Sequence, residues 1–401
     1  MKMLIQNKET FKRVLFRSSM VICLLLIGCR DKSIDHIKRG NDHLNKGEYD
    51  QAISEFTKAI EINPGFAEAY NNRGWAYYNK GEYDRAITDY NKAIQFDPDF
   101  GLAYINRGNA YFEKGQYDMA ISDYNKAIEI NPKYANAYNN RGNVYNAKGQ
   151  YDRAISDFNK AIEINPKYAQ AYYNRGIAYF EKGRYDRAIS DYNKAIEINP
   201  KYANAYNNRG NVYKAKGEYN RAILDYTKAI EIDPGHAAAY NNRGVAYGEK
   251  GQYDRAISDY TKAIEINPRF AAAYYNRGLA YQNKGEYDQA IPDYNKALEI
   301  NPRLAEAYNG LAWLLATCPD GNNRDGLKAI DNATRACELS QWKNSSLLDT
   351  LAAAYAEVGE FEKAVKWQSE AIELAATDND KHAMQSRLKL YRAGKPYRKE
   401  P

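Results

Sequence analysis

A basic residue and an acidic residue recur together along this chain. Eight arginines are spaced 34 residues apart, and an acidic residue follows each of them after 16 residues. A guanidinium group can bind a carboxylate through two parallel hydrogen bonds, and the same fork could bind an anionic ligand. The arginines are Arg39, Arg73, Arg107, Arg141, Arg175, Arg209, Arg243 and Arg277, and the acidic residues are Glu55, Asp89, Asp123, Asp157, Asp191, Asp225, Asp259 and Asp293. Two interpretations are therefore open: internal ion pairs, or a row of arginines that faces a ligand.

The way the pattern is lost favours internal ion pairs. In two divergent stretches near the C-terminus, the arginine position holds Leu311 and Leu351, and the acidic position holds Asn332 and Trp367. Both members disappear together, whereas a row of ligand-binding arginines has no reason to follow the acidic position. We therefore expect each arginine to pair with the acidic residue of its own repeat or of an adjacent one. Such partly exposed pairs contribute only about 0–1 kcal/mol each.

The arginines belong to a 34-residue repeat in which two helices must position them. Counting Ala67 as position 1, each unit has Tyr at 4, Gly at 8, Tyr at 11, Gly at 15, Ala at 20, Tyr or Phe at 24, Ala at 27 and Pro at 32. Positions 4, 8 and 11 share one face of a helix, as do positions 20, 24 and 27. Glycine at position 15 permits the left-handed turn that ends the first helix, and proline at position 32 stops the second. The sequence therefore predicts one helix–turn–helix hairpin per repeat.

This pattern resembles the tetratricopeptide repeat, whose signature places the same small, aromatic and proline residues at the same intervals. Eight units that match it well cover residues 33–304. The resemblance implies an all-α fold, a right-handed superhelical solenoid of helix–turn–helix repeats. We expect ten hairpins and no strand, because each hairpin needs its neighbours to bury its apolar faces.

The C-terminal residues depart from the repeat. Residues 305–344 form a degenerate repeat whose turn is lengthened around "CPDGNNRD", and residues 345–378 form the last repeat. Residues 379–392 predict a polar capping helix, because the end of a solenoid must face water. We expect residues 393–401, "AGKPYRKEP", to form a basic and disordered tail. Pro292 is expected to bend its helix slightly, since it removes one backbone hydrogen bond.

The composition offers no recognisable catalytic or metal-binding motif. The chain contains 57 basic and 51 acidic residues, with both signs interleaved in every repeat, which is typical of a solvated helical surface rather than a nucleic-acid interface. The four cysteines and four histidines lack metal-ligand spacing, and there is no phosphate-binding glycine loop or nucleophile elbow. We therefore expect no enzyme activity, no cofactor, no metal and no nucleic-acid partner. Cys318 and Cys337 should stay unpaired, because the predicted hairpin separates them by more than roughly 10 Å, beyond the reach of a disulfide.

The first residues resemble a bacterial lipoprotein signal. Positive charges precede an apolar run at Met20–Ile27, which is too short to span a bilayer, since a spanning helix needs about 20 apolar residues. The run ends in Leu26-Ile27-Gly28-Cys29, which resembles the lipobox, in which the cysteine becomes the lipidated first residue of the mature chain. The resemblance implies that residues 1–28 are removed and that residues 29–32, with the lipid on Cys29, form a short tether. An uncleaved membrane anchor, or a true start at Met20, is the alternative.

The resemblance to tetratricopeptide repeats also implies where a partner binds. In that family the first helices line a concave groove, chiefly through positions 2, 5, 9, 12 and 13. On this chain the groove is rich in asparagine and aromatic residues: Asn71, Trp75, Tyr78, Asn109, Phe112, Asn139, Asn143, Asn146, Tyr173, Phe180, Asn207, Asn211, Asn241 and Tyr275. Amide groups can donate to and accept from a peptide backbone, and aromatic faces can hold apolar side chains or sugar rings. The alternative is that these asparagines only keep an exposed helix soluble.

Together the patterns predict a non-enzymatic scaffold anchored to the bacterial cell envelope, on its periplasmic or outer-membrane face. We expect it to bind a protein or peptide partner in the groove. A different class remains open, a glycan-binding or polysaccharide-export accessory lipoprotein. No repeat has Lys at position 5, which argues against the family subtype that clamps a C-terminal carboxylate. The N-terminal half, near residues 71–180, should supply most of the affinity, because the aromatic residues Trp75, Tyr78 and Phe112 lie there and aromatic anchors dominate interfaces.

Overall fold

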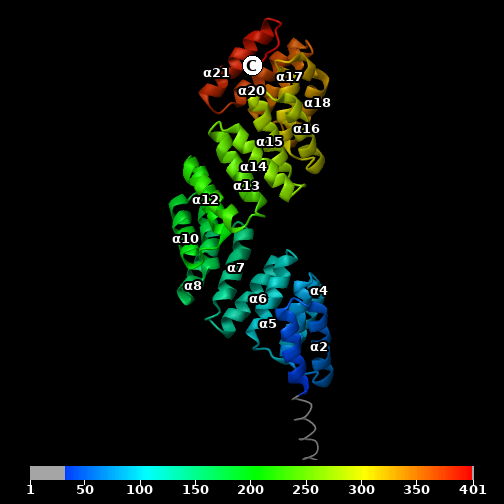
Figure 1. The fold of residues 1–401 in the computed structure, drawn as a ribbon, viewed down its shortest axis with the longest axis vertical. Coiled ribbons are helices and arrows are strands. Elements are labelled where there is room, and N and C mark those ends of the chain that lie inside the picture. Colours follow the sequence, from blue (N-terminus) through cyan, green and yellow to red (C-terminus); the bar gives the residue numbers. More distant parts are fainter. Residues whose placement is uncertain (1–31, 400–401) are drawn as a thin grey trace, which may run out of the picture. The chain divides into compact units, whose positions relative to one another are not determined.

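A computed structural model describes residues 32–399 of the chain (Figure 1). Within that range every regular element is a helix and no strand occurs, so the predicted all-helical solenoid class is confirmed. The chain divides after Ile198 into two compact units, Met1–Ile198 and Asn199–Pro401, which are described one at a time. The predicted signal sequence and Cys29 lie outside the described residues.

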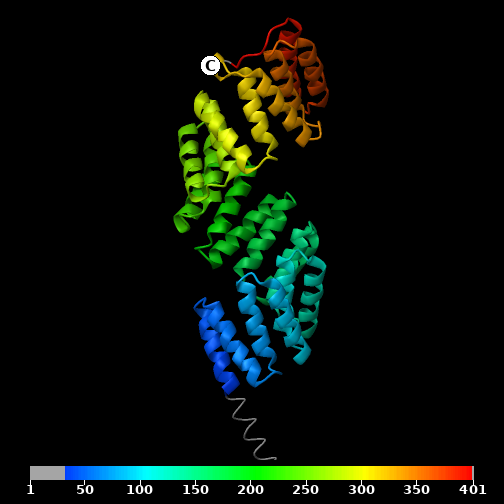
Figure 2. The same ribbon diagram turned by 90° about the vertical axis from the view of Figure 1, so that its right-hand side faces the viewer.

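The first unit consists of consecutive helix pairs, coloured blue to green (Figure 2). In each full repeat the first helix has 13 residues and the second has 14. Each second helix that is followed by another repeat of this unit also contacts the first helix of that repeat. The helices are residues 32–45, α2 (Tyr49–Ile62), α3 (Ala67–Asn79), α4 (Tyr83–Phe96), α5 (Gly101–Glu113), α6 (Tyr117–Ile130), α7 (Ala135–Ala147), α8 (Tyr151–Ile164), α9 (Ala169–Glu181) and α10 (Tyr185–Ile198).

The second unit continues the pairing and then departs from it. The turn between α17 and α18 is longer than the others and contains a short 3-10 helix. Pro292 lies inside α16, which remains one helix across it. The elements are α11 (Ala203–Ala215), α12 (Tyr219–Ile232), α13 (Ala237–Glu249), α14 (Tyr253–Ile266), α15 (Ala271–Lys284), α16 (Tyr287–Ile300), α17 (Ala305–Thr317), η1 (Gly321–Asn323), α18 (Gly326–Leu339), α19 (Ser345–Glu357), α20 (Phe361–Leu374) and α21 (Asp378–Arg392).

A left-handed glycine ends the first helix of each regular repeat. Gly183, at position 15, has φ +68°, a conformation that costs an L-residue energy but not glycine. The next amide, that of Arg184, then donates 2.8 Å back to the carbonyl of Tyr179. This is the Schellman geometry, which satisfies a carbonyl that the helix end would otherwise leave unpaired. The turn therefore fixes the angle at which the second helix returns along the first.

A second glycine allows the two helices of a repeat to approach closely. A Cβ built on Gly176, at position 8, would lie 2.7 Å from a ring carbon of Tyr192, at position 24. Ala188 and Ala195, at positions 20 and 27, are fully buried beside that ring. Small residues on one helix thus leave room for a large ring from the other. The many tyrosines at position 24 consequently form the core rather than a binding surface.

The C-terminal tail is ordered through residue 399, so the expectation of a disordered tail is wrong for the described residues. The ring of Tyr397 lies 5.8 Å from that of Trp313. Arg398 forms an ion pair with Glu357 at 2.5 Å, and the amide of Lys399 donates to the carbonyl of Thr317 at 3.0 Å. The basic composition suggested disorder, but an aromatic ring on α17 and a glutamate on α19, which also pairs with Arg324, provide attachment points.

The two C-terminal cysteines are free and buried, as the predicted hairpin requires. Cys318 follows α17 directly, and Cys337 lies in the last turn of α18. Burial raises the pKa of the Cys337 thiol to about 12. Since the thiolate is the reactive form, this cysteine should be inert toward thiol reagents in the folded protein.

The close approach of the helices predicts opposite effects for two glycine substitutions. Gly176→Ala should destabilise the protein by about 1–3 kcal/mol, because the added methyl overlaps the Tyr192 ring. Gly248→Ala is the matched control: it is also helical, but its Cβ would meet only the Tyr260 hydroxyl, at 3.8 Å. That substitution should be neutral or stabilising by up to about 1 kcal/mol, the helix propensity difference. Thermal unfolding followed by circular dichroism tests both, and a Gly176→Ala protein at least as stable as the wild type would contradict the packing argument.

Candidate functional site

The recurring arginines form ion pairs with the acidic residue of their own repeat. Arg175 donates from Nε to Asp191 Oδ2 at 2.8 Å and from Nη2 to Asp191 Oδ1 at 2.6 Å. The same two-bond geometry, at 2.6–2.8 Å, joins the arginine and aspartate of all seven repeats from Arg73 to Arg277. Arg39 donates from Nε to Glu55 at 2.7 Å. The aspartates are only 4–6% exposed, so each guanidinium neutralises a carboxylate that burial would otherwise penalise.

Six of the guanidinium groups also reach the preceding repeat. Nη1 of Arg175 donates 2.6 Å to Asn159, at position 25 of that repeat. The guanidinium carbon lies 5.4 Å from the ring centroid of Tyr172, one turn earlier on the same helix. Arg107, Arg141, Arg73, Arg243 and Arg277 make the equivalent contact with Asn or Thr at position 25. The arginines are thus structural links between helices and between repeats, and the alternative of a ligand-binding row is wrong.

The asparagines predicted at groove position 5 are structural as well. Asn174, at position 6, donates 3.0 Å to Asn139, at position 5 of the preceding repeat. The same bond joins Asn106 to Asn71 at 3.0 Å, Asn242 to Asn207 at 3.1 Å and Asn276 to Asn241 at 2.9 Å. The acceptors Asn71, Asn139, Asn207 and Asn241 are only 2–7% exposed. We name these bonds the asparagine ladder. Its burial corrects the prediction that these four residues contact a partner, and it also excludes the alternative that they solubilise an exposed surface.

Two asparagines at position 9 also accept hydrogen bonds from the position-6 asparagine of the following repeat. Asn109 accepts from Asn140 at 2.9 Å and from the hydroxyl of Tyr124 at 2.7 Å. Asn211 has the equivalent acceptor role toward Asn242 and Tyr226. The recurring Asn at position 6 was visible in every Asn-Arg-Gly triplet, but its partner lies 31 or 35 residues away, so the triplet alone gave no sign of the bond.

The remaining predicted groove asparagines, Asn143 and Asn146, are half-buried on α7. The side-chain oxygen of Asn146 is buried and has no hydrogen-bond partner among the described residues. A buried acceptor without a partner costs free energy, so a donor from a bound molecule would be favoured there. Asn146 therefore stays a candidate contact, unlike the four asparagines of the ladder.

We call positions 2, 5, 9, 12 and 13 of the first helices the first-helix face. Aromatic residues are accessible on this face. Trp75 is 37% exposed, and its ring stacks on that of Tyr78 at 5.2 Å and 9°. The hydroxyl of Tyr78 donates to Glu113 at 3.4 Å, and burial together with that carboxylate raises the pKa of Tyr78 to about 12. Tyr78 therefore stays neutral and keeps an apolar face beside the exposed indole ring.

The rings of three residues at position 12 pack at a tilt against the tyrosine at position 17 of the same repeat. Tyr78 lies 5.5 Å from Tyr83, and Phe112 lies 5.7 Å from Tyr117. Phe180 repeats this contact with Tyr185, also at 5.7 Å. The rings of the predicted groove residues Tyr173 and Tyr275 instead pack against the core rings of Tyr192 and Tyr294. Ring pairs thus cover the first-helix face wherever position 12 is aromatic.

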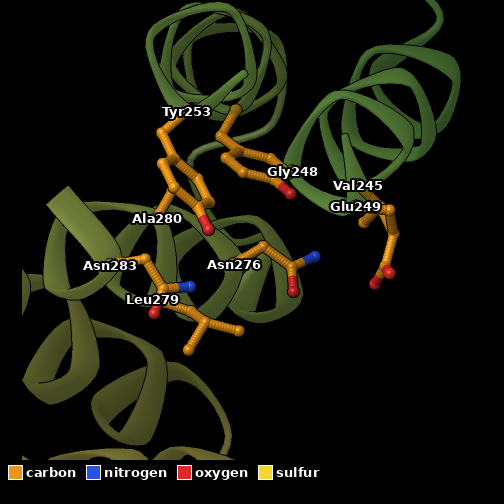
Figure 3. A pocket seen from close by; sticks show the side chains of 9 residues that line it. Val245, Gly248, Glu249, Tyr253, Asn276, Leu279, Ala280 and Asn283 are labelled. Atoms are coloured by element: carbon orange, nitrogen blue, oxygen red, sulfur yellow. The ribbon is translucent and has the colours of Figure 1, made fainter. Parts of the chain in front are cut away.

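The repeat that begins at Ala237 has glycine at position 12 in place of an aromatic ring, and a cavity lies beside it. A cavity of about 380 Å³ lies between α13, α14 and α15, next to Gly248 at position 12 (Figure 3). The ring of Tyr253 projects into it from α14, facing Leu279 and Asn283 of α15. Its other lining residues are Val245, Glu249, Tyr260, Asn276 and Ala280. The sequence shows glycine at this position, but nothing in the local pattern indicated that neighbouring side chains would leave the space open.

The chain's own tail covers the first-helix face of the last two repeats. Trp313 is at position 9 of α17, and Glu357 is at position 13 of α19; they contact Tyr397 and Arg398 respectively. Arg387 of the capping helix forms two bonds of 2.8 Å with Asp349, at position 5 of α19. Residues 305–357 therefore have this face occupied by residues 387–399, whereas the earlier repeats do not.

Consecutive helix pairs with a glycine turn, joined by a recurring contact between repeats, define a helical solenoid of tandem repeats. Profiles described as TPR repeat or tetratricopeptide repeat match residues 40–81, 76–115, 108–147, 142–183, 178–217, 210–251, 237–270, 271–304 and 346–378. These matches span more than half of the sequence, and the chain belongs to the tetratricopeptide repeat family. Membership of this family supports a protein-interaction scaffold.

One solved structure agrees with this fold, and two further ones show a more limited likeness. A tetratricopeptide repeat protein from Parabacteroides merdae ATCC 43184 aligns at a TM-score of 0.50 and 24% identity, covering 65% of this chain and 99% of that one. MamA aligns at a TM-score of 0.38 and 34% identity, covering 43% and 93%. YrrB, a TPR protein with an unusual peptide-binding site, aligns at 0.38 and 29%, covering 46% and 95%. A search of curated proteins gave no match.

Two further findings concern the described part of the chain only. No helix in residues 32–399 combines the length and the apolar character needed to cross a membrane. The same residues contain no group of His, Cys, Asp and Glu side chains arranged to hold a metal ion.

The ion pairs predict a coupled loss of stability. Arg175→Met and Asp191→Asn should each destabilise the first unit by about 1–3 kcal/mol, because each leaves a buried polar partner unsatisfied. The double variant should cost less than the sum of the two, since it leaves no unpaired charge. Arg184→Met, at an exposed position in the turn between α9 and α10, is the control and should change stability little. Amide hydrogen exchange in α9 and α10 measures all four proteins, and strictly additive losses would show that the pair does not couple.

The ion pair between Arg39 and Glu55 predicts that the stability of the protein depends on pH. Hydrogen bonds from Arg39, Lys58 and His36 lower the pKa of Glu55 from 4.5 to about 2. A lowered folded-state pKa stabilises the protein fully above the unfolded value and loses that effect as the pH falls through the folded value. Wild type should therefore exceed Glu55→Gln in stability at pH 6, and the difference should vanish between about pH 4.5 and 2. Hydrogen exchange in α2 across this range is the measurement, and a difference that stays constant down to pH 2 would contradict it.

Proposed function

We propose that this chain is a scaffold that binds an extended segment of a partner protein on its first-helix face. The observation that carries the proposal is the tail, because residues 395–399 lie on that face of α17 and α19 without regular secondary structure of their own. Aromatic stacking, an ion pair and a backbone hydrogen bond hold the tail there. A segment of another protein can use the same three interactions on the repeats that the tail leaves uncovered.

The tail also indicates the chemistry of that segment. The ring of Tyr397 packs against that of Trp313, and Arg398 pairs with Glu357, at position 13 of α19. The same position holds Glu113, Glu181 and Glu249, all of them exposed. Aromatic and acidic side chains therefore recur on the open first helices. We infer a partner segment that combines aromatic and basic residues.

Position along the chain bears on affinity. The exposed Trp75 ring and the ring pairs of Tyr78, Phe112 and Phe180 all lie in the first unit, so we propose that residues 71–180 supply most of the affinity. A test of this proposal compares substitutions of these aromatic residues with reference substitutions in the second unit. Asn241 and Gln282 are unsuitable as reference positions, because Asn241 belongs to the asparagine ladder and Gln282 is buried against the hydroxyl of Tyr294. An exposed apolar residue on a second helix serves better.

We further propose that a lipid on Cys29 attaches the scaffold to the bacterial envelope. The support is the sequence pattern alone: a basic start, a short apolar run and the lipobox-like residues. Three residues would separate the lipid from the first repeat, so the N-terminal repeats would lie close to the bilayer. Cys29→Ser should move the protein from the membrane fraction to the soluble fraction of lysed cells. Unchanged membrane association would exclude the lipid as the anchor.

A glycan partner is the second candidate. The stacked Trp75 and Tyr78 rings present a flat apolar surface that a sugar ring could cover. Sugars also need polar groups around such a surface, and the ladder already occupies the amides of Asn71 and Asn139. A protein segment is therefore the preferred partner.

A peptide-display selection tests the proposal. A phage-displayed library of random 12-residue peptides, selected on the full-length chain, should yield sequences with aromatic and basic residues. Trp75→Ala combined with Phe112→Ala should weaken their binding about tenfold or more, as expected for aromatic anchors. Leu224→Ala, 71% exposed on α12, is the control and should leave affinity unchanged. Failure to enrich any peptide, together with Trp75-dependent binding on a glycan array, would favour the glycan alternative.

A further inference from the structure

We propose that the cavity beside Gly248 is an anchor pocket for one aromatic side chain, Phe or Tyr, of the bound segment. This inference rests on the proposed function, since it names a specific subsite on the first-helix face. The cavity lies wholly within the second unit, between α13, α14 and α15. Its volume of about 380 Å³ is in the lower part of the range for pockets that enclose small ligands, about 300–1,000 Å³.

The other repeats identify the occupant. In three of them, a ring at position 12 packs at a tilt against the tyrosine at position 17, with centroids 5.5–5.7 Å apart. In the repeat that begins at Ala237, the tyrosine is present as Tyr253, but position 12 is Gly248. The stacking surface is therefore retained while the ring that would cover it is absent. An aromatic side chain from a partner would complete a contact that the chain itself makes elsewhere.

Two other position-12 residues of the second unit have side chains with contacts of their own. Gln282 extends inward and accepts a 2.7 Å hydrogen bond from the buried hydroxyl of Tyr294. Lys214 is half-buried, and that burial lowers its pKa despite the nearby Glu249 carboxylate. Each of these side chains occupies the space next to its own helix pair. Gly248, which has no side chain, cannot do so.

The walls of the pocket suit a ring with a polar edge. Val245, Leu279 and Ala280 provide apolar contact around the face of Tyr253. The Tyr260 hydroxyl lies at the floor, 3.8 Å from where a Cβ on Gly248 would be. In the repeats of Tyr124 and Tyr226 this hydroxyl donates to an asparagine at position 9, but Val245 occupies that position here and cannot accept. The hydroxyl is thus available to an acceptor such as a phenol oxygen or a peptide carbonyl.

The rim of the pocket fixes what can lie next to the ring. Glu249 is exposed at one side, and Asn276 and Asn283 line the other (Figure 3). A basic residue beside the anchoring ring would meet Glu249 in the way that Arg398, next to Tyr397, meets Glu357. We therefore infer that the anchored sequence is an aromatic residue adjacent to Arg or Lys.

Filling the pocket from within the protein is the decisive experiment. Gly248→Phe should place a ring on Tyr253, as Phe180 does on Tyr185, without backbone strain, because the only neighbour near the new Cβ is at 3.8 Å. Those display-selected peptides that keep their affinity for the protein with the Trp75 and Phe112 substitutions, synthesised with a fluorescent label, should bind this variant about tenfold or more weakly than wild type. Gly248→Ala is the matched control and should keep affinity within about threefold. Leu279→Asp, which changes an exposed wall residue, is a second variant whose folding does not depend on the new ring.

The peptides provide the complementary measurement. Replacing their aromatic residue by Leu should weaken binding to wild type but should change little in binding to Gly248→Phe, whose pocket is already filled. If every selected peptide binds Gly248→Phe and Leu279→Asp as tightly as wild type and loses affinity with the Trp75 and Phe112 substitutions, the pocket is overturned and the proposed function stays intact. A selection that yields no peptide would overturn both.

Discussion

The two-bond contact between an arginine of the first helix and an aspartate of the second is the interaction on which the rest of the structure depends. Arg175 links Asp191 in its own repeat to Asn159 in the preceding one and covers a tyrosine ring. A single side chain thereby fixes the angle within a hairpin and the register between hairpins. A buried ion pair adds little net free energy, but breaking it is costly, so its main effect is to exclude other arrangements of the helices.

The asparagine ladder extends the same logic to neutral groups. Amides such as Asn139 and Asn174 are buried at contacts between successive first helices, where each bond satisfies a group that burial would otherwise penalise. The ladder uses the polar capacity of positions 5 and 6 for assembly of the solenoid. The first-helix face is consequently left with the varied residues of positions 9 and 12, aromatic in several repeats, and with acidic groups at position 13 of several repeats.

Periodicity made the fold predictable, and its limits explain the errors. The helices, the turns and the arginine pairs follow from residues that recur within one repeat. The burial of Asn71 and its relatives depends on a contact between repeats, which spacing within one repeat cannot indicate. The ordered tail depends on Tyr397 meeting Trp313, a pair 84 positions apart with no recurring pattern. The cavity at Gly248 results from a missing side chain, and only the arrangement of three helices shows whether neighbours fill such a gap.

These constraints determine where the repeats can differ in binding. The ladder, the ion pair and the close glycine contact require Asn, Arg and Gly at positions 6 to 8, so variation there would damage the fold. The helices α7 and α11 illustrate the consequence, because their 13 residues are identical except at position 12, where Asn146 replaces Lys214. Position 12 takes no part in the ion pair, the ladder or the close glycine contact, and it can hold an aromatic ring, an amide, an ammonium group or nothing but glycine. A scaffold built from almost identical units can therefore distinguish one stretch of a bound segment from another by changing this single position.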